Sequence, residues 1–178
     1  MNIGIYGGSF NPIHFGHIGL VQWVAENTDL DEIWLMVSPN NPLKDNSILA
    51  DEKVRLHEAE KAIKNIGKNT IIVSDFEFTL PRPSYTANTL RELSKQYPNH
   101  QFTLVIGEDN LNIFTQWREY EYILTNYHIL VYPRKGCEQT AEEMISKLHI
   151  KNIKGIQILH DAPHFEISST ELRKNLHN

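Results

Sequence analysis

Residues 7–17 read Gly7-Gly8-Ser9-Phe10-Asn11-Pro12-Ile13-His14-Phe15-Gly16-His17. A short apolar run, residues 3–6, precedes this stretch, and an amphipathic run, residues 18–25, follows it. That order predicts a strand, a tight loop and a helix, with the loop lying over the helix N-terminus. Because unpaired backbone N–H groups and the positive end of the helix dipole both favour negative charge, the stretch predicts an anion-binding loop.

Two residue types in this loop point to phosphate chemistry. Gly7 and Gly8 are expected to bend the backbone sharply and to let a ligand approach without an intervening Cβ. His14 and His17 lie three residues apart, so both imidazoles face the same side if a helix begins here. Imidazole donors can stabilise charge that develops on phosphate oxygens. The alternative for this pair is that it only packs against or caps the helix.

The rest of the chain alternates between strand and helix patterns, which predicts an α/β fold with a mostly parallel sheet and helices on both faces. Strands are expected over residues 2–6, 32–37, 71–74, 101–106, 128–132 and 156–159. Helices are expected over residues 18–25, 51–66 and 138–148, and further helices are expected to begin near Leu111 and at Ser169. The helix over 51–66 has an apolar stripe of Leu56, Ala59, Ile63 and Ile66. Another helix is expected to contain Leu90, Leu93 and Tyr97 and to end at Pro98. Loops are expected over 38–47, 78–85 and 133–136, and ligand contacts are expected where loops follow the carboxyl ends of strands.

Composition limits the function. With 178 residues, 40% apolar and 22% charged, the chain is expected to form one domain over residues 1–178. A net charge of −5 argues against nucleic-acid binding, and no apolar run is long enough to cross a membrane. We expect a cytoplasmic protein, in agreement with a single cysteine, Cys137, that we interpret as incidental. Neither the P-loop pattern nor the Gly-x-Gly-x-x-Gly fingerprint is present.

Several motifs, taken in order, carry a family resemblance. His14-x-Gly16-His17 resembles the (H/T)xGH signature of the nucleotidylyltransferases, and residues 167–173, Ile-Ser-Ser-Thr-Glu-Leu-Arg, resemble their second nucleotide signature. Between them lie residues 39–44 (Pro-Asn-Asn-Pro-Leu-Lys), 83–86 (Pro-Ser-Tyr-Thr) and 106–111 (Ile-Gly-Glu-Asp-Asn-Leu) with Trp117. Together they resemble the bacterial nicotinate-nucleotide adenylyltransferase family over nearly the whole chain. The resemblance implies a Rossmann-like, doubly wound nucleotidyltransferase domain.

The resemblance also implies a set of site residues. The catalytic residues it implies are His14, His17, Lys44 and Arg173. The implied ATP-binding residues are Gly7, Gly8, Ser9, Phe10, His14, His17, Ser168, Ser169, Thr170 and Arg173. The implied acceptor-binding residues are Asn40, Thr86, Gly107, Asp109 and Trp117. Trp117 would stack on the nicotinate ring. No residue is expected to bind a metal directly, because Mg²⁺ would be held mainly through the ATP phosphates.

Each of these residues also has a plainer interpretation. Ser169 or Thr170 could cap a helix, and Arg173 and Lys44 could be solvated surface charges. Asp109 could be the N-cap of a following helix, and Trp117, at helical spacing from Ile113 and Tyr120, could belong to the core. Trp23 and Trp34 have no motif around them and are interpreted as core residues.

Three positions depart from the commonest form of the family. Ser9 stands where threonine is frequent and keeps the hydroxyl. Asn11 stands where aspartate is frequent, which puts any role that needs a carboxylate in doubt. Arg118 follows Trp117 where an aromatic residue is often found.

The implied reaction transfers AMP from ATP to nicotinate mononucleotide, giving deamido-NAD and pyrophosphate. Three alternatives stay open: a nicotinamide mononucleotide acceptor, a phosphopantetheine acceptor, or a sensor that binds a nucleotide without turning it over. Neither nucleic acid nor membrane is expected as a partner, and a homo-oligomer is compatible with the sequence.

Overall fold

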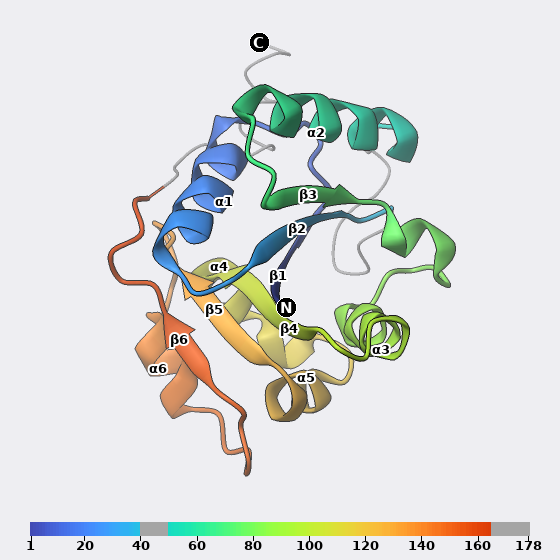
Figure 1. The fold of residues 1–178 in the computed structure, drawn as a ribbon. Coiled ribbons are helices and arrows are strands. Elements are labelled where there is room, and N and C mark those ends of the chain that lie inside the picture. Colours follow the sequence, from blue (N-terminus) through green and yellow to red (C-terminus); the bar gives the residue numbers. More distant parts are fainter. Residues whose placement is uncertain (40–49, 165–178) are drawn as a thin grey trace.

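The computed structural model describes residues 1–39 and 50–164, which form a six-stranded sheet with helices on both faces (Figure 1). The strands are β1 (Asn2–Gly8), β2 (Glu32–Val37), β3 (Ile71–Ser74), β4 (Gln101–Gly107), β5 (His128–Tyr132) and β6 (Ile156–Ile158). Their spatial order is β3-β2-β1-β4-β5-β6, and every neighbouring pair is parallel. The predicted α/β fold is confirmed, with a sheet that is entirely parallel. The strand order reverses between β1 and β4, which is where ligands bind in such sheets.

The helices form two layers that bury the two faces of the sheet. One layer holds α1 (Phe15–Asn27) and α2 (Glu52–Ile66); the other holds α3 (Thr86–Gln96), α4 (Glu108–Asn112), α5 (Tyr120–Asn126) and α6 (Ala141–Ser146) (Figure 1). Two 3₁₀ helices, η2 (Phe76–Thr79) and η3 (Phe114–Gln116), lie beside the second layer. Because both faces are covered, strand residues such as Ile3, Leu35 and Val131 are fully buried, which explains their continuous apolar runs. None of the helices in the described parts of the chain is long and apolar enough to cross a membrane.

The strand predictions were close, but the sharp bend expected at the glycines at the end of β1 was wrong. Gly7 and Gly8 continue the strand and pair with Met36 and Val37 of β2. The sharp turn comes two residues later, at Phe10, whose φ is 47°. The ring of Phe10 lies directly over Gly8, where an added Cβ would be 3.1 Å from its Cζ. Gly8 therefore provides space for a turn that is made elsewhere.

The apolar stripe predicted for α2 also needs correction. Ala59 and Ile63 are buried as expected, but Leu56 and Ile66 are only half-buried. The third fully buried position of the stripe is Arg55, at 3% exposure. Residues 55, 59 and 63 are four apart, so the buried face follows helical spacing but begins with a charged residue.

Other elements differ in length or were not expected. α1 begins at Phe15, before the amphipathic run; α5 was not predicted; α6 is shorter than residues 138–148; β6 ends at Ile158; and η2 occupies the start of the expected loop 78–85. Trp23 and Trp34 are half-buried at the edges of the two core clusters and not inside them. The helix expected from Ser169, and most of the loop expected over 38–47, lie outside the described residues.

Candidate active site

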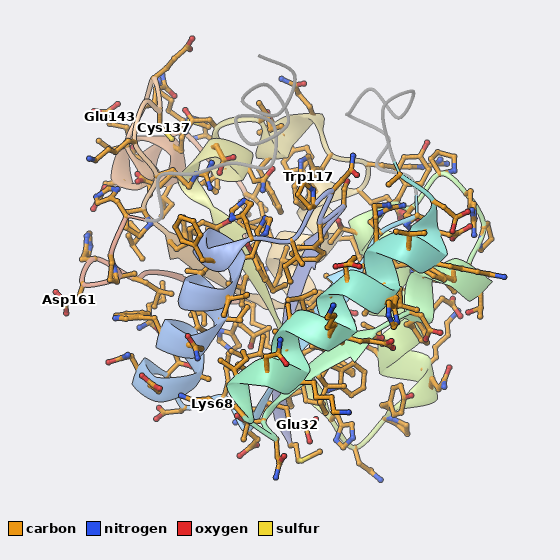
Figure 2. All side chains as sticks on the ribbon, turned by 90° about the horizontal axis from the view of Figure 1, so that it is seen from above. Glu32, Lys68, Trp117, Cys137, Glu143 and Asp161 are labelled. Atoms are coloured by element: carbon orange, nitrogen blue, oxygen red, sulfur yellow. The ribbon has the colours of Figure 1, made fainter. Side chains whose placement is uncertain are left out.

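A cavity of about 530 Å³ opens at the carboxyl ends of the central strands, where the strand order reverses. Figure 2 shows Trp117, one of its lining residues, at the opposite end of the molecule from Glu32, the first residue of β2. The polar and aromatic lining includes Tyr6, Ser38, Glu77, Ser84, Tyr85, Thr86, Thr89, Asp109, Trp117, Arg118 and Tyr132, together with the backbone of Gly7 and Gly8. The lining therefore contains Trp117 and four other residues that the family resemblance assigns to nucleotide binding: Gly7, Gly8, Thr86 and Asp109.

His14 and His17 form a stacked pair at the N-terminus of α1. His14 is the N-cap, and its Nδ1 accepts a hydrogen bond from the N–H of Gly16 at 3.1 Å. The Nδ1 of His17 in turn accepts from the N–H of His14 at 3.2 Å. The rings lie 3.7 Å apart between centroids, at an interplanar angle of 22°. The helix cap that we considered as the plainer role of this pair is therefore present in the structure.

These bonds also set where each imidazole carries its proton. A neutral ring whose Nδ1 accepts a hydrogen bond has its proton on Nε2, so we infer the Nε2–H tautomer for both histidines. Capping thus uses Nδ1 of each ring, and the second polar atom of each ring is Nε2, which is buried in His14. Helix capping and phosphate binding are compatible in the same two side chains.

The histidine pair lies beside the cavity rather than in its lining. The ring of His17 is 4.9 Å from that of Phe10 and 6.4 Å from that of Tyr6, between centroids. Tyr6 lines the cavity, and its ring also meets that of Tyr132, which lines the cavity from β5. This aromatic cluster joins the N-terminus of α1 to the cavity wall. Burial raises the pKa of Tyr132 to about 12, so its hydroxyl keeps its proton at neutral pH.

The far wall of the cavity carries the residues that the resemblance assigns to the acceptor. Thr86 is the first residue of α3. Trp117 is half-buried, is tilted against Phe114 with ring centroids 4.9 Å apart, and follows η3 with an extended backbone. The helical spacing from Ile113 to Tyr120 therefore does not describe this segment. The guanidinium carbon of Arg118 lies 4.8 Å above the centroid of the Tyr85 ring, so the side chain that departs from the family pattern helps to form this wall.

Gly107 allows Asp109 to reach the cavity. Gly107 is the last residue of β4 and the N-cap of α4, and a Cβ on it would lie 2.4 Å from Asp109 Oδ1 and 2.9 Å from the Tyr132 ring. Asp109 lies inside the first turn of α4, so its interpretation as an N-cap is wrong. Its Oδ1 is 4.0 Å from Nε of Arg134.

Ser9 and Asn11 connect the turn after β1 to its surroundings. Among the described residues, the buried Oγ of Ser9 has no hydrogen-bond partner. Asn11 is 7% exposed, and its Oδ1 accepts a hydrogen bond from the N–H of Ala50 at 3.2 Å. An amide oxygen accepts this hydrogen bond as a carboxylate oxygen would, so asparagine in place of the frequent aspartate at position 11 keeps the contact with Ala50.

Sequence reasoning missed a buried polar group in the cavity lining. Glu77 of η2 is 7% exposed, and its Oε1 accepts a hydrogen bond from Thr89 Oγ1 at 2.9 Å. Burial raises the pKa of the Glu77 carboxyl. Ser84, at 8% exposure, lines the same region. Ser84 lies in the Pro-Ser-Tyr-Thr motif and could have been found there, whereas nothing in the sequence around Glu77 marks it.

The remaining predicted residues lie outside the described ranges. They are Asn40, Lys44, Ser168, Ser169, Thr170 and Arg173. Within residues 1–39 and 50–164, no group of three His, Cys, Asp or Glu side chains could hold a metal ion. Cys137 is half-buried beside Gly136, and burial raises the pKa of its thiol, which makes it a poor nucleophile.

Comparison with known proteins places this fold and cavity in a family. A family model described as cytidylyltransferase-like matches residues 5–175. A probable nicotinate-nucleotide adenylyltransferase of Flavobacterium psychrophilum is 44% identical over 178 residues, covering 100% of this chain and 88% of the relative. One of Bacteroides fragilis is 44% identical over 173 residues, covering 97% of this chain and 81% of the relative.

A solved structure has the same fold. The nicotinic acid mononucleotide adenylyltransferase of Plasmodium falciparum, complexed with NaAD, has a TM-score of 0.80 at 23% identity, covering 97% of this chain and 82% of the other. The chain therefore belongs to the cytidylyltransferase-like family of nucleotidyltransferases. Within that family it is similar over its whole length to nicotinate-nucleotide adenylyltransferases.

Proposed function

We propose that this protein transfers AMP from ATP to nicotinate mononucleotide, producing deamido-NAD and pyrophosphate. The observation that carries the proposal is the position of the stacked His14 and His17 at the N-terminus of α1, joined through Tyr6 to a cavity at the β1–β4 crossover. A helix N-terminus with two Nε2–H donors suits the ATP phosphates. The adjoining cavity, with Trp117 on its wall, suits a flat nucleotide ring.

The reaction needs positioning and charge stabilisation more than a nucleophilic side chain. The acceptor's 5′-phosphate is ionised at neutral pH and attacks the α-phosphorus of ATP in line, forming the new P–O bond as the bond to pyrophosphate breaks. His14 and His17 donate hydrogen bonds to phosphate oxygens on which charge develops. Asp109 is half-exposed at the cavity rim and is suited to accept hydrogen bonds from ribose hydroxyls.

Four further contributions rest on the family resemblance. Lys44 and Arg173 would neutralise charge on the leaving pyrophosphate, and residues 168–170 would bind the triphosphate. Asn40 would contact the acceptor. Mg²⁺ would be held mainly through the ATP phosphates.

The wall formed by Arg118 favours the acid over the amide acceptor. Its guanidinium lines the cavity and lies over the Tyr85 ring, one residue from Trp117. A cation at this wall attracts a nicotinate carboxylate and gains nothing from a neutral carboxamide. This contact supports nicotinate mononucleotide over nicotinamide mononucleotide as the acceptor.

An acceptor panel tests the proposal. Pyrophosphate release would be measured with ATP, Mg²⁺ and, separately, nicotinate mononucleotide, nicotinamide mononucleotide and phosphopantetheine. The proposal predicts the highest kcat/KM with nicotinate mononucleotide. A preference for phosphopantetheine would indicate the other adenylyltransferase, and nucleotide binding without pyrophosphate release from any acceptor would indicate a sensor.

A further inference from the structure

We propose that Arg55 is a positioning residue that holds the turn after β1 against both ends of the segment carrying Lys44. Its guanidinium donates four hydrogen bonds, all to backbone carbonyls. Nη1 donates to Ser9 O and Ser38 O, both at 2.7 Å, Nε donates to Ala50 O at 2.9 Å, and Nη2 donates to Pro39 O at 3.3 Å. Pro39 and Ala50 directly flank residues 40–49 in the sequence.

The burial of Arg55 is unusual for a side chain of this charge. Arg55 is 3% exposed, and no carboxylate among the described residues lies within ion-pair distance of it. A buried charge is costly unless its donors are satisfied, and here carbonyl oxygens accept all four hydrogen bonds while the charges of Glu52 and Asp51 act from further away. An apolar residue at this position would continue the stripe of Ala59 and Ile63 without that cost. The charged side chain therefore has a role other than filling the core.

Arginine suits this role better than lysine. Its planar fork offers five N–H donors in fixed directions, so one side chain can bond carbonyls that come from three separate segments. A lysine ammonium has three donors at a single point and cannot reach all four carbonyls with the same geometry. The four bonds fix the relative positions of Ser9, residues 38–39 and Ala50.

Two neighbouring bonds support the same connection. The N–H of Ser38 donates to Gly8 O at 2.8 Å, and the N–H of Ala50 donates to Asn11 Oδ1 at 3.2 Å. The first joins the end of β1 to Ser38, and the second joins the turn after β1 to Ala50. Arg55 bonds the same three places, through the carbonyls of Ser9, Ser38 and Ala50. Under the proposed function, this sets the histidine loop relative to Pro39 and Ala50.

The test compares Arg55→Met, Arg55→Lys and a control on the same helix, Ile63→Ala. Ile63 is buried at 6% exposure in the core and lies eight residues after Arg55 on α2, so its variant serves as the stability control. Hydrogen exchange of the amides of residues 8–17 would be measured alongside Tm, kcat and both KM values. Urea would be added to the more stable variants until all have the same unfolded fraction.

We expect Arg55→Met to speed exchange at residues 8–17 and to lower kcat by about tenfold to a hundredfold, because a small displacement of aligned groups has that effect. Arg55→Lys should restore part of the slow exchange and part of kcat. At matched stability, Ile63→Ala should change neither the exchange of residues 8–17 nor kcat. Wild-type exchange and kcat in Arg55→Met, or equal changes in Ile63→Ala, would overturn the proposal. If the wild-type protein transfers no AMP, the proposed function fails while the exchange measurement still decides the role of Arg55.

Discussion

The imidazoles of His14 and His17 lie 3.7 Å apart and nearly parallel, and each ring uses Nδ1 to accept a main-chain hydrogen bond. The helix cap therefore fixes the tautomer and the direction of both Nε2–H donors before any ligand binds. Such preorganised donors stabilise developing charge without reorganising during the reaction. The first turn of α1 is in this sense both a structural element and part of the proposed catalytic machinery.

Replacing His17 by asparagine should separate these two roles. Asn Oδ1 can take the place of Nδ1 and accept from the His14 N–H, but Asn has no group at the position of Nε2. We expect His17→Asn to reduce kcat by about a hundredfold or more, as loss of one preorganised donor does, while Tm stays near the wild-type value. His17→Ala should lose activity as well and also lower stability by about 1 kcal/mol through the lost cap. Near-normal turnover in either variant would contradict the role given to His17.

Trp117 should act on the acceptor alone. Stacking of a base on an aromatic side chain is worth about 1–3 kcal/mol, so Trp117→Ala should raise KM for nicotinate mononucleotide by about 5- to 150-fold. KM for ATP should change little. Trp23→Ala is the matched control, because Trp23 packs at the edge of the α1–α2 layer and does not line the cavity. An equal rise in both KM values would argue against an acceptor-specific contact.

Arg118 should control the preference between acid and amide. A charge interaction at this exposed position is worth about 1 kcal/mol, or about fivefold. Arg118→Gln should therefore lower the ratio of kcat/KM for nicotinate over nicotinamide mononucleotide by about that factor, and the effect should shrink in high salt. Arg118→Lys, which keeps the charge, should keep most of the ratio. An unchanged ratio in Arg118→Gln would assign the discrimination to other groups.

Glu77 should make stability depend on pH. Burial raises its pKa in the folded state above the ordinary carboxyl value of 4.5, so the folded state binds more protons than the unfolded state. Its contribution to stability is then full below pH 4.5 and is lost as pH rises through the folded-state pKa. Glu77→Gln removes this loss and can still accept from Thr89. In urea unfolding, its stability relative to wild type should be higher at about pH 8 than at about pH 5; a difference that does not vary with pH would contradict the assignment.

The order of strands and helices could be predicted because apolar runs and helical spacing are local properties of the sequence. Continuous apolar runs such as residues 104–106 mark strands covered on both faces, and the spacing of Leu90 and Leu93 marks the buried side of α3. Element ends were less predictable. Gly7 and Gly8 continue β1 because β2 offers partners for them, which only the sheet reveals.

Motifs marked part of the cavity lining, whereas tertiary packing produced buried polar groups that no motif marked. Gly7, Gly8, Thr86, Asp109 and Trp117 were all expected, and all line one cavity. Glu77 and Arg55 were not expected, because charged residues normally face solvent. Their burial depends on Thr89 in one case and on the carbonyls of three distant segments in the other. No local pattern encodes such contacts.

The most direct measurement of the central claim is a single-turnover reaction with enzyme in excess over ATP labelled at the α-phosphate, quenched at successive times. With nicotinate mononucleotide and Mg²⁺ present, the label should pass from ATP to deamido-NAD in step with pyrophosphate release. It should never appear on the protein, and it should move far more slowly in His17→Asn. Label that stays in ATP, or that becomes attached to the protein before any dinucleotide forms, would contradict direct transfer between two nucleotides held at the N-terminus of α1.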